Sequence, residues 1–129
     1  MKKPCEGTFH CENVRFQIKA NIDHVRVCNC SICAKRGALI FRVPKSDFHL
    51  LTSMENLALY KWGSCIGEDY FCRNCGILPF RKPSALTLEE IRKGITPFDG
   101  WAVNVRCLKN IDYTRLPIVK IDGLKITLK

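Results

Sequence analysis

The cysteines at positions 28, 30 and 33 constrain the fold of this chain more than any other feature, because three thiols fall within six residues. On an extended strand Cys28 and Cys30 point to the same face, since side chains alternate along a strand. A short turn at Ser31–Ile32 can then bring Cys33 back to the same point. Three protein ligands leave a position open for water or substrate, whereas a structural zinc site is closed by four. This first cysteine cluster (Cys28, Cys30 and Cys33) therefore predicts an open metal site, and a site closed by a distant fourth residue is the alternative.

A second metal-binding turn is indicated by Cys72 and Cys75, which are followed by Gly76. The glycine lets the backbone fold back and direct N–H groups at the sulfurs, which lowers the cost of holding negative charge there. A redox dithiol is the competing interpretation of this spacing. That chemistry is expected in a βαβ setting, which this sequence lacks.

Cys11 is the natural partner of this pair, because it opens the strand predicted at residues 14–19. We refer to Cys11, Cys72 and Cys75 as the second cysteine cluster. Cys5 lies upstream and is preferred as a fourth ligand over His10, whose side chain would point away from that of Cys11 on an extended chain. We expect this site to be structural, because metal binding that requires the folded chain adds to its stability.

The cysteine content favours metal ligation over disulfide bonds. A chain of 129 residues, 47% of them hydrophobic, can bury roughly two-thirds of its unfolded surface and needs no covalent cross-links to fold. Nine cysteines also leave one thiol over if the others pair. No apolar signal region follows Met1–Pro4, and no apolar run approaches the roughly 18 residues of a membrane-spanning helix. We expect a single cytoplasmic domain over residues 1–129, with residues 1–6 as a flexible arm.

The formal net charge of +9, from 21 basic and 12 acidic side chains, favours an anionic partner. A carboxylate-bearing metabolite, a phosphate or a nucleic acid would each fit. The basic residues are spread along the chain without a purely basic five-residue block, so most are expected on a solvated surface. A nucleic acid is therefore a partner that the sequence permits but does not favour.

Short segments with alternating or apolar patterns predict an all-β domain of two packed sheets. Thr87 and Glu90 form a capping box for one short helix that ends before Gly94. Lys35–Gly37 reads as a basic turn, and Asp122–Gly123 predicts a hairpin turn. The predicted strands are residues 14–19, 23–28, 38–43, 48–51, 58–62, 101–107, 118–121 and 124–128.

Four further side chains each have two interpretations. Cys107 shares a strand face with the valines at 103 and 105, which favours a core thiol over a catalytic one. Cys65 lies between glycines and is expected in a loop, where a reactive thiol is the alternative. Glu68 and Asp69 precede the second cysteine cluster and are expected to be exposed, although one of them could accept a proton near a metal-bound thiol.

Four motifs follow one another along the chain: His10-Cys11 before Val14-Arg15-Phe16, Cys28-Asn29-Cys30-Ser31-Ile32-Cys33, Tyr70-Phe71-Cys72-Arg73-Asn74-Cys75-Gly76 before Pro79-Phe80, and Val103-Asn104-Val105-Arg106-Cys107-Leu108. Their order and spacing resemble the glutathione-dependent formaldehyde-activating enzyme family, which also includes the centromere protein V domain. The resemblance extends from about Gly7 to Gly123 and so covers nearly the whole chain.

This resemblance implies a tent-like all-β fold of two antiparallel sheets with two zinc sites. The first cysteine cluster would hold the catalytic zinc. The structural zinc of the family uses an early Cys-x-Cys pair together with the later Cys-x-x-Cys pair. Phe9 stands where the family has the first early cysteine. Either Cys5 replaces that ligand, or the second site is weaker, three-coordinate or empty.

The resemblance also implies the condensation of formaldehyde with glutathione to S-hydroxymethylglutathione, a zinc-dependent carbon–sulfur lyase-type reaction. An open zinc site suits it, because zinc lowers the pKa of a bound thiol and polarises a carbonyl group. Lys35, Arg36 and Arg106 would anchor the carboxylates of glutathione, and Asn104 would hydrogen-bond a peptide group. A solvated surface is an equal alternative for Lys35 and Arg36.

Two other classes of function stay open on the sequence alone. A zinc-stabilised binding module for chromatin or another acidic partner would suit the basic charge, although the chain carries no appended basic tail. A thiol redox protein would need a nucleophile that is free of metal, for which Cys65 and Cys107 are the candidates.

Overall fold

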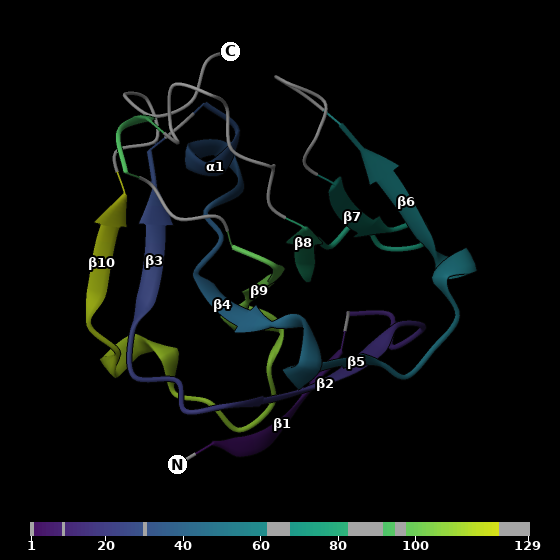
Figure 1. Cartoon of the computed structure of the whole chain (residues 1–129). Coiled ribbons are helices and arrows are strands. Elements are labelled where there is room, and N and C mark those ends of the chain that lie inside the picture. The colour runs from purple at the N-terminus through teal and green to yellow at the C-terminus, as the bar shows by residue number, and fades with distance from the viewer. Residues whose placement is uncertain are drawn as a thin grey trace.

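A seven-stranded sheet forms the body of the computed structural model, and a three-stranded sheet packs against it (Figure 1). The structure describes residues 2–8, 10–29, 31–61, 68–82, 92–94 and 98–121. Among these residues the two sheets are accompanied by one short α-helix, α1 (Ser31–Arg36). The predicted fold class, mainly all-β with two sheets and one short helix, is confirmed.

Antiparallel pairing dominates among the described strands. The three-stranded sheet has the order β1-β2-β5, with β1 at Lys3–Thr8, β2 at Arg15–Ala20 and β5 at Phe48–Leu50. The larger sheet has the order β10-β3-β4-β9-β8-β7-β6, and its β10–β3 pair is parallel. Its strands are β3 (Val25–Cys28), β4 (Ile40–Pro44), β6 (Leu57–Tyr60), β7 (Glu68–Cys72), β8 (Phe80–Lys82), β9 (Gly100–Asn104) and β10 (Ile118–Ile121). Short 3-10 turns lie at η1 (Lys45–Asp47), η2 (Met54–Asn56), η3 (Val105–Cys107) and η4 (Tyr113–Arg115).

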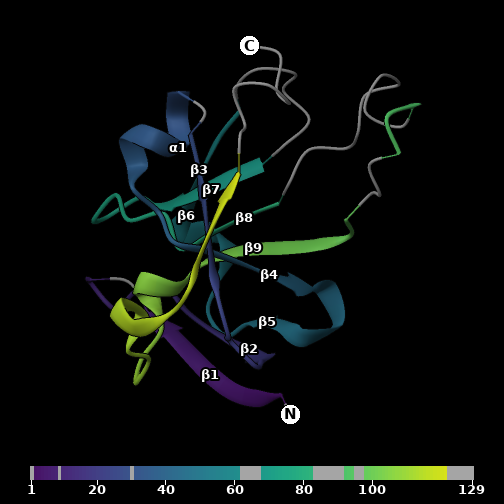
Figure 2. The same ribbon diagram turned by 90° about the vertical axis from the view of Figure 1, so that its left-hand side faces the viewer.

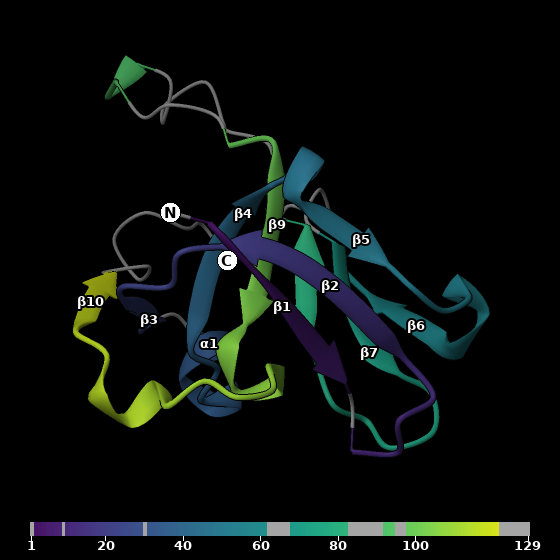
Figure 3. The same cartoon turned by 90° about the horizontal axis from the view of Figure 1, so that it is seen from below.

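Aromatic rings join the two sheets. Phe16 of β2 and Phe48 of β5 meet Phe80 of β8 and Trp101 of β9. The centroid of the Phe48 ring lies 4.9 Å from that of Phe80 and 4.8 Å from that of Trp101, and the Phe16 and Phe80 centroids are 5.3 Å apart. Such pairs each contribute about 0.5–1.5 kcal/mol beyond the burial of their surface. The cluster therefore fixes where β1, β2 and β5 lie on the larger sheet (Figure 3).

Helix α1 lies at the end of the molecule opposite to β1, β2 and β5 (Figures 1 and 2). It follows almost directly on β3, and Gly37 ends it with φ +64°, the left-handed conformation that glycine adopts most readily. The backbone N–H of Gly37 donates to the carbonyl of Cys33 at 3.0 Å. No helix in the described part of the chain is both long and apolar enough to cross a lipid bilayer.

Three segments differ from the prediction. Residues 3–6, expected within a flexible arm, belong to β1, which pairs with β2 along its whole length. Pro4 is tolerated there because β1 is an edge strand. The expected turn at Lys35–Gly37 is the end of α1. The strand predicted at 101–107 stops at Asn104, because the Asn104 side chain accepts a hydrogen bond from the backbone N–H of Arg106 at 3.2 Å and so starts η3.

Three predicted features lie outside the described residues. These are the capping pair Thr87 and Glu90 of the predicted helix, the hairpin turn at Asp122–Gly123, and the strand at residues 124–128. The other predicted strands before residue 122 correspond, with shifted ends, to β2, β3, β4, β5, β6 and β10.

Gly7 is required where β1 passes the ring of Phe16. The two residues face each other across the β1–β2 pair, and Gly7 is buried. A Cβ atom at this position would overlap the Phe16 ring, which Phe48 and Phe80 hold from other sides. The glycine therefore allows β1 to approach the aromatic cluster closely.

Replacing Gly7 by alanine should lower the free energy of unfolding by about 1–3 kcal/mol, because the ring of Phe16 has to move. Urea denaturation measures the loss. In a Phe16→Leu background the same substitution should cost less, since leucine leaves room for the new methyl group. An equal cost in both backgrounds would show that the ring is not the obstacle.

Candidate active site and metal centre

The structure brings the second cysteine cluster together. The sulfur atoms of Cys11, Cys72 and Cys75 lie within 4.8 Å of one another, and those of Cys11 and Cys72 are 3.4 Å apart. Cys11 belongs to the connection between β1 and β2, Cys72 is the last residue of β7, and Cys75 lies in the turn that follows. Three thiols at this separation form a donor set that suits a soft cation such as zinc.

The turn after β7 supports this cluster as the sequence predicts. The Cys72 sulfur accepts hydrogen bonds from the backbone N–H groups of Asn74 and Cys75, at 3.3 and 3.5 Å. Gly76 has φ +79°, and its N–H donates to the carbonyl of Cys72 at 2.9 Å. The glycine therefore closes the turn that directs N–H groups at sulfur.

The pKa values of the two closest thiols move in opposite directions. A backbone hydrogen bond at Asn13 is the main cause that lowers the pKa of Cys11 to about 7. Burial is the main cause that raises the pKa of Cys72, although the N–H groups of Cys75 and Asn74 oppose it. Cys11 is thus the first of the two to ionise, and the Cys72 thiol then serves as its hydrogen-bond donor.

The structure does not bring Cys5 into this cluster. Cys5 pairs with Ile18 in the middle of the β1–β2 ladder, and its thiol lies 3.7 Å from the carbonyl oxygen of Lys3. Strand pairing therefore keeps it away from the loop that carries Cys11, which the sequence could not show. His10 is exposed and is not part of the cluster either. Phe9 lies outside the described residues.

The first cysteine cluster is described only in part, because Cys30 lies outside the described residues. Cys28 is the last residue of β3, and Cys33 lies in α1. Ser31–Ile32, expected as a short turn, is the start of α1 instead. The convergence of the three sulfurs on one metal stays a prediction.

A cavity of about 680 Å³ is lined in part by residues that are close in the sequence to both cysteine clusters. Arg36 on its wall comes one helical turn after Cys33, His10 precedes Cys11, and Gly76 follows Cys75. Its volume lies in the range of small-molecule sites. The lining residues are Thr8, His10, Arg36, Ala38, Tyr60, Phe71, Gly76, Ile77, Leu78, Asn104, Arg106 and Cys107.

Three of the four predicted ligand-binding side chains line this cavity, namely Arg36, Asn104 and Arg106, whereas Lys35 is exposed and does not. The side-chain amide of Asn104 donates to the carbonyl of Leu78 at 3.2 Å, so it braces the wall. The guanidinium of Arg106 lies 5.0 Å from the centroid of the Tyr113 ring. Among the described residues no acid pairs with Arg106, which leaves its charge available to a ligand.

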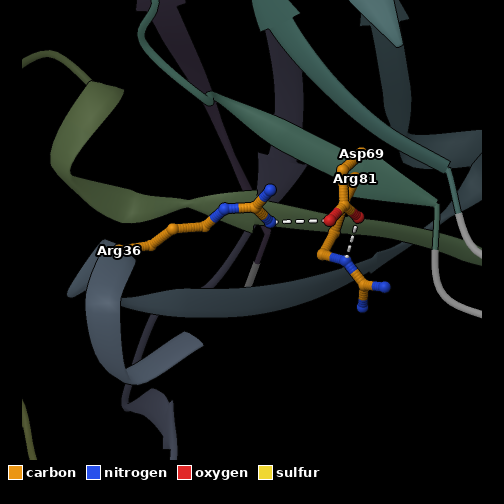
Figure 4. Close-up of polar contacts among 3 residues, drawn as sticks. All are labelled: Arg36, Asp69 and Arg81. Atoms are coloured by element: carbon orange, nitrogen blue, oxygen red, sulfur yellow. Dashed lines mark hydrogen bonds and ion pairs between the residues drawn. The ribbon is translucent and has the colours of Figure 1, made fainter. Parts of the chain in front are cut away.

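Asp69 is fully buried and joins two arginines (Figure 4). Its two carboxylate oxygens accept hydrogen bonds at 2.6 Å from Nη1 of Arg36 and from Nε of Arg81. The expectation that Asp69 is an exposed acid was wrong. Asp69 follows Glu68 at the start of β7, so the sequence gives no clear signal that one of the two acids is buried. Its arginine partners follow from the pairing of β7 with β8 and from the position of α1.

Replacing Asp69 by asparagine should lower the free energy of unfolding by about 3 kcal/mol, because two guanidinium groups lose their shared counter-charge. Their side chains are only 23% and 20% exposed, so water compensates little. Asp99→Asn is the control, since Asp99 lies 4.0 Å from Lys45 and both side chains are mostly exposed. It should cost less than about 1 kcal/mol. Equal losses in urea denaturation would contradict a structural role for Asp69.

Two comparisons with known proteins agree with this architecture. The family model of the glutathione-dependent formaldehyde-activating enzyme matches residues 4–96, which is more than half of the chain. The crystal structure of a Rhodobacter sphaeroides protein is also similar, with a TM-score of 0.71 and 28% sequence identity over 88% of this chain and 99% of that chain. The chain therefore belongs to the glutathione-dependent formaldehyde-activating enzyme family.

Proposed function

We propose that the chain catalyses the addition of glutathione to formaldehyde in the cavity beside the two cysteine clusters. Family membership supports a glutathione-related activation of formaldehyde. The observation that carries the proposal is the cavity itself. Its wall presents Arg106, which pairs with no acid among the described residues, and Arg36, which lies one helical turn after Cys33. A cytoplasmic location, where glutathione is abundant and thiols stay reduced, fits this chemistry.

The reaction needs no oxidant or reductant. The glutathione sulfur forms a bond to the carbonyl carbon, and the π electron pair of formaldehyde moves to its oxygen. That oxygen takes up one proton, which balances the proton lost by the thiol. The product is S-hydroxymethylglutathione, and the reverse reaction breaks the same carbon–sulfur bond.

The charged groups on the cavity wall have separate parts in this proposal. Arg106 would bind a carboxylate of glutathione, since it has no acidic partner among the described residues. Arg36 already pairs with Asp69 through Nη1, so it would hold α1 against the sheet and leave Nη2 for the ligand. Tyr60 and Phe71 supply apolar surface. The thiol would then lie toward α1 and the first cysteine cluster.

Zinc would be held by Cys28, Cys30 and Cys33, with the second cysteine cluster as a structural site. Three thiolates suit an open zinc site at the first cluster, whereas the second cluster would need a fourth ligand, another side chain or water, to close a structural site. When bound, the metal at the first cluster would supply a lowered thiol pKa and polarisation of the carbonyl group. The protein side chains would keep glutathione in the cavity with its sulfur close to the first cysteine cluster.

The alternatives have less support. Burial raises the pKa of the Cys107 thiol to about 11, so it is protonated at neutral pH and a poor nucleophile. Cys65, the other redox candidate, lies outside the described residues. A chromatin-binding module would use the basic charge alone, and a gel shift with duplex DNA that is absent or independent of salt would exclude it.

The activity is best tested at equilibrium, because the uncatalysed addition is fast. Exchange of ¹³C-labelled formaldehyde with S-hydroxymethylglutathione can be followed by NMR exchange spectroscopy. The zinc-loaded protein should raise the exchange rate in proportion to its concentration. No acceleration at any concentration would overturn the proposed reaction.

Replacing Arg106 by glutamine should raise KM for glutathione about tenfold with little change in kcat, because a charged anchor holds substrate and transition state equally. Arg115→Gln is the matched control, since that side chain is 88% exposed and bonds to Asp112 away from the cavity wall. A fall in kcat with unchanged KM would contradict an anchoring role.

The zinc content should depend on Cys72 but not on Cys5. Elemental analysis of Cys72→Ser is expected to show the loss of one zinc per chain, because one of the three clustered sulfurs is gone. Cys5→Ser should retain the wild-type content, since its thiol lies outside the cluster. Loss of zinc in Cys5→Ser would restore Cys5 as the fourth ligand.

A further inference from the structure

One face of the seven-stranded sheet carries three arginines, of which the Asp69 network accounts for only one. Arg42 of β4, Ala102 of β9, Arg81 of β8 and Asp69 of β7 lie opposite one another in a single row across four strands. Directly opposed residues of antiparallel strands point to the same face. Arg42 and Arg81 therefore flank the small, buried Ala102, with their backbones about 10 Å apart.

Arg26 belongs to the same face. It lies opposite Ile40 across the β3–β4 pair, and Ile40 is two residues before Arg42 on β4. Side chains two apart on a strand share a face. We refer to Arg26, Arg42 and Arg81 as the arginine face.

The described residues balance only part of the positive charge of the arginine face. Asp69 binds Arg81 and Arg36, and no described acid lies within ion-pair distance of Arg26 or Arg42. Partial burial is the main cause that lowers the pKa of Arg42, and the charges of Arg26 and Arg81 lower it further. Like charges held together without a counter-ion are costly, and proteins gather them where an anion binds.

The guanidinium groups of Arg42 and Arg81 are held in place, and that of Arg42 is the more accessible of the two. That of Arg42 lies 5.1 Å from the centroid of the Phe98 ring, and the residue is exposed to solvent. Arg81 is fixed to Asp69 through Nε, and Figure 4 shows its two terminal nitrogens pointing away from that carboxylate. A planar fork that is held at one side in this way is suited to bind a carboxylate or phosphate with two hydrogen bonds.

The arginine face adjoins the cavity. Asn104 on the cavity wall is two residues beyond Ala102 on β9, which corresponds to about 7 Å along the strand. Tyr60, also on the wall, lies opposite Asp69 at the end of the row. A ligand that fills the cavity can therefore extend an acidic group onto the arginine face.

We propose that Arg26, Arg42 and Arg81 form an oxyanion subsite that binds a carboxylate of the ligand in the cavity. The subsite is separate from the Arg106 anchor, so the ligand it selects carries two acidic groups. Its assignment to a carboxylate of glutathione rests on the proposed function, whereas the anion site itself does not.

The test uses S-methylglutathione, a thioether that has no thiol to add to formaldehyde. Isothermal titration of the zinc-loaded protein should show binding that weakens about tenfold in Arg42→Gln and in Arg26→Gln, because each removes a charged hydrogen-bond donor. Arg15→Gln, the same charge change on β2 of the other sheet, should leave the affinity unchanged. Unchanged affinity in both arginine-face variants would overturn the subsite.

Two further arms identify the anion and separate the two proposals. In the first arm the affinity for inorganic phosphate is measured. If phosphate binds the wild type more tightly than S-methylglutathione does, and binds Arg42→Gln more weakly, the subsite binds a phosphate group and not a carboxylate. S-methylglutathione binding that weakens in Arg42→Gln, in a protein that does not accelerate formaldehyde exchange, would refute the proposed reaction and still support the subsite.

Discussion

The carboxylate of Asp69 is the contact on which the rest of the site depends. It joins Arg36 and Arg81, residues 33 and 12 positions away in the sequence, at a point that water does not reach. A buried carboxylate is stable only when its oxygens are paired, and the two arginines supply both partners. Because Arg36 lies one helical turn after Cys33, the same contact sets how α1, and with it part of the first cysteine cluster, lies against the sheet.

The second cysteine cluster is held by backbone contacts as well as by its thiols. Asn56 donates from its side chain to the carbonyl of Asn13 at 3.0 Å and accepts at its own carbonyl from the N–H of Arg73, also at 3.0 Å. One residue thus connects the loop that carries Cys11 with the turn that carries Cys75. The three sulfurs are gathered by these polypeptide contacts, so the binding of a cation would need little rearrangement.

The sequence was most informative where chemistry is local. Alternating residues predicted β2, and the spacing of Cys72, Cys75 and Gly76 predicted a turn with N–H groups directed at sulfur, which the structure has. The prediction that Cys11 lies beside that turn rested on its thiol as a potential metal ligand. What failed depends on pairing between distant segments. Such pairing turned an expected arm into β1 and held Cys5 away from the cluster.

The same limit explains the charges of the site. Asp69, Arg36 and Arg81 read as three unrelated charged residues until α1, β7 and β8 are placed together. A strand register cannot be deduced from one sequence when several short strands have similar patterns. The end of β9 was also misplaced in the prediction. The Asn104 side chain accepts a hydrogen bond from the backbone N–H of Arg106, and this contact replaces the strand pairing that was expected beyond Asn104.

Part of the net charge of +9 lies on the walls around the candidate site, where it can offset the negative charge of the thiolates. Three thiolates around one divalent zinc would carry a net negative charge, which repels a thiolate or a carboxylate that approaches it. Cations on the surrounding walls offset that repulsion, and they act most strongly where water is partly excluded. Asp69 cancels part of this positive charge where it joins Arg36 and Arg81, whereas no described acid pairs with Arg42 or Arg106. Among the described residues the one fully buried acid therefore positions α1 and β8, and Arg42 and Arg106 stay available to an anionic ligand.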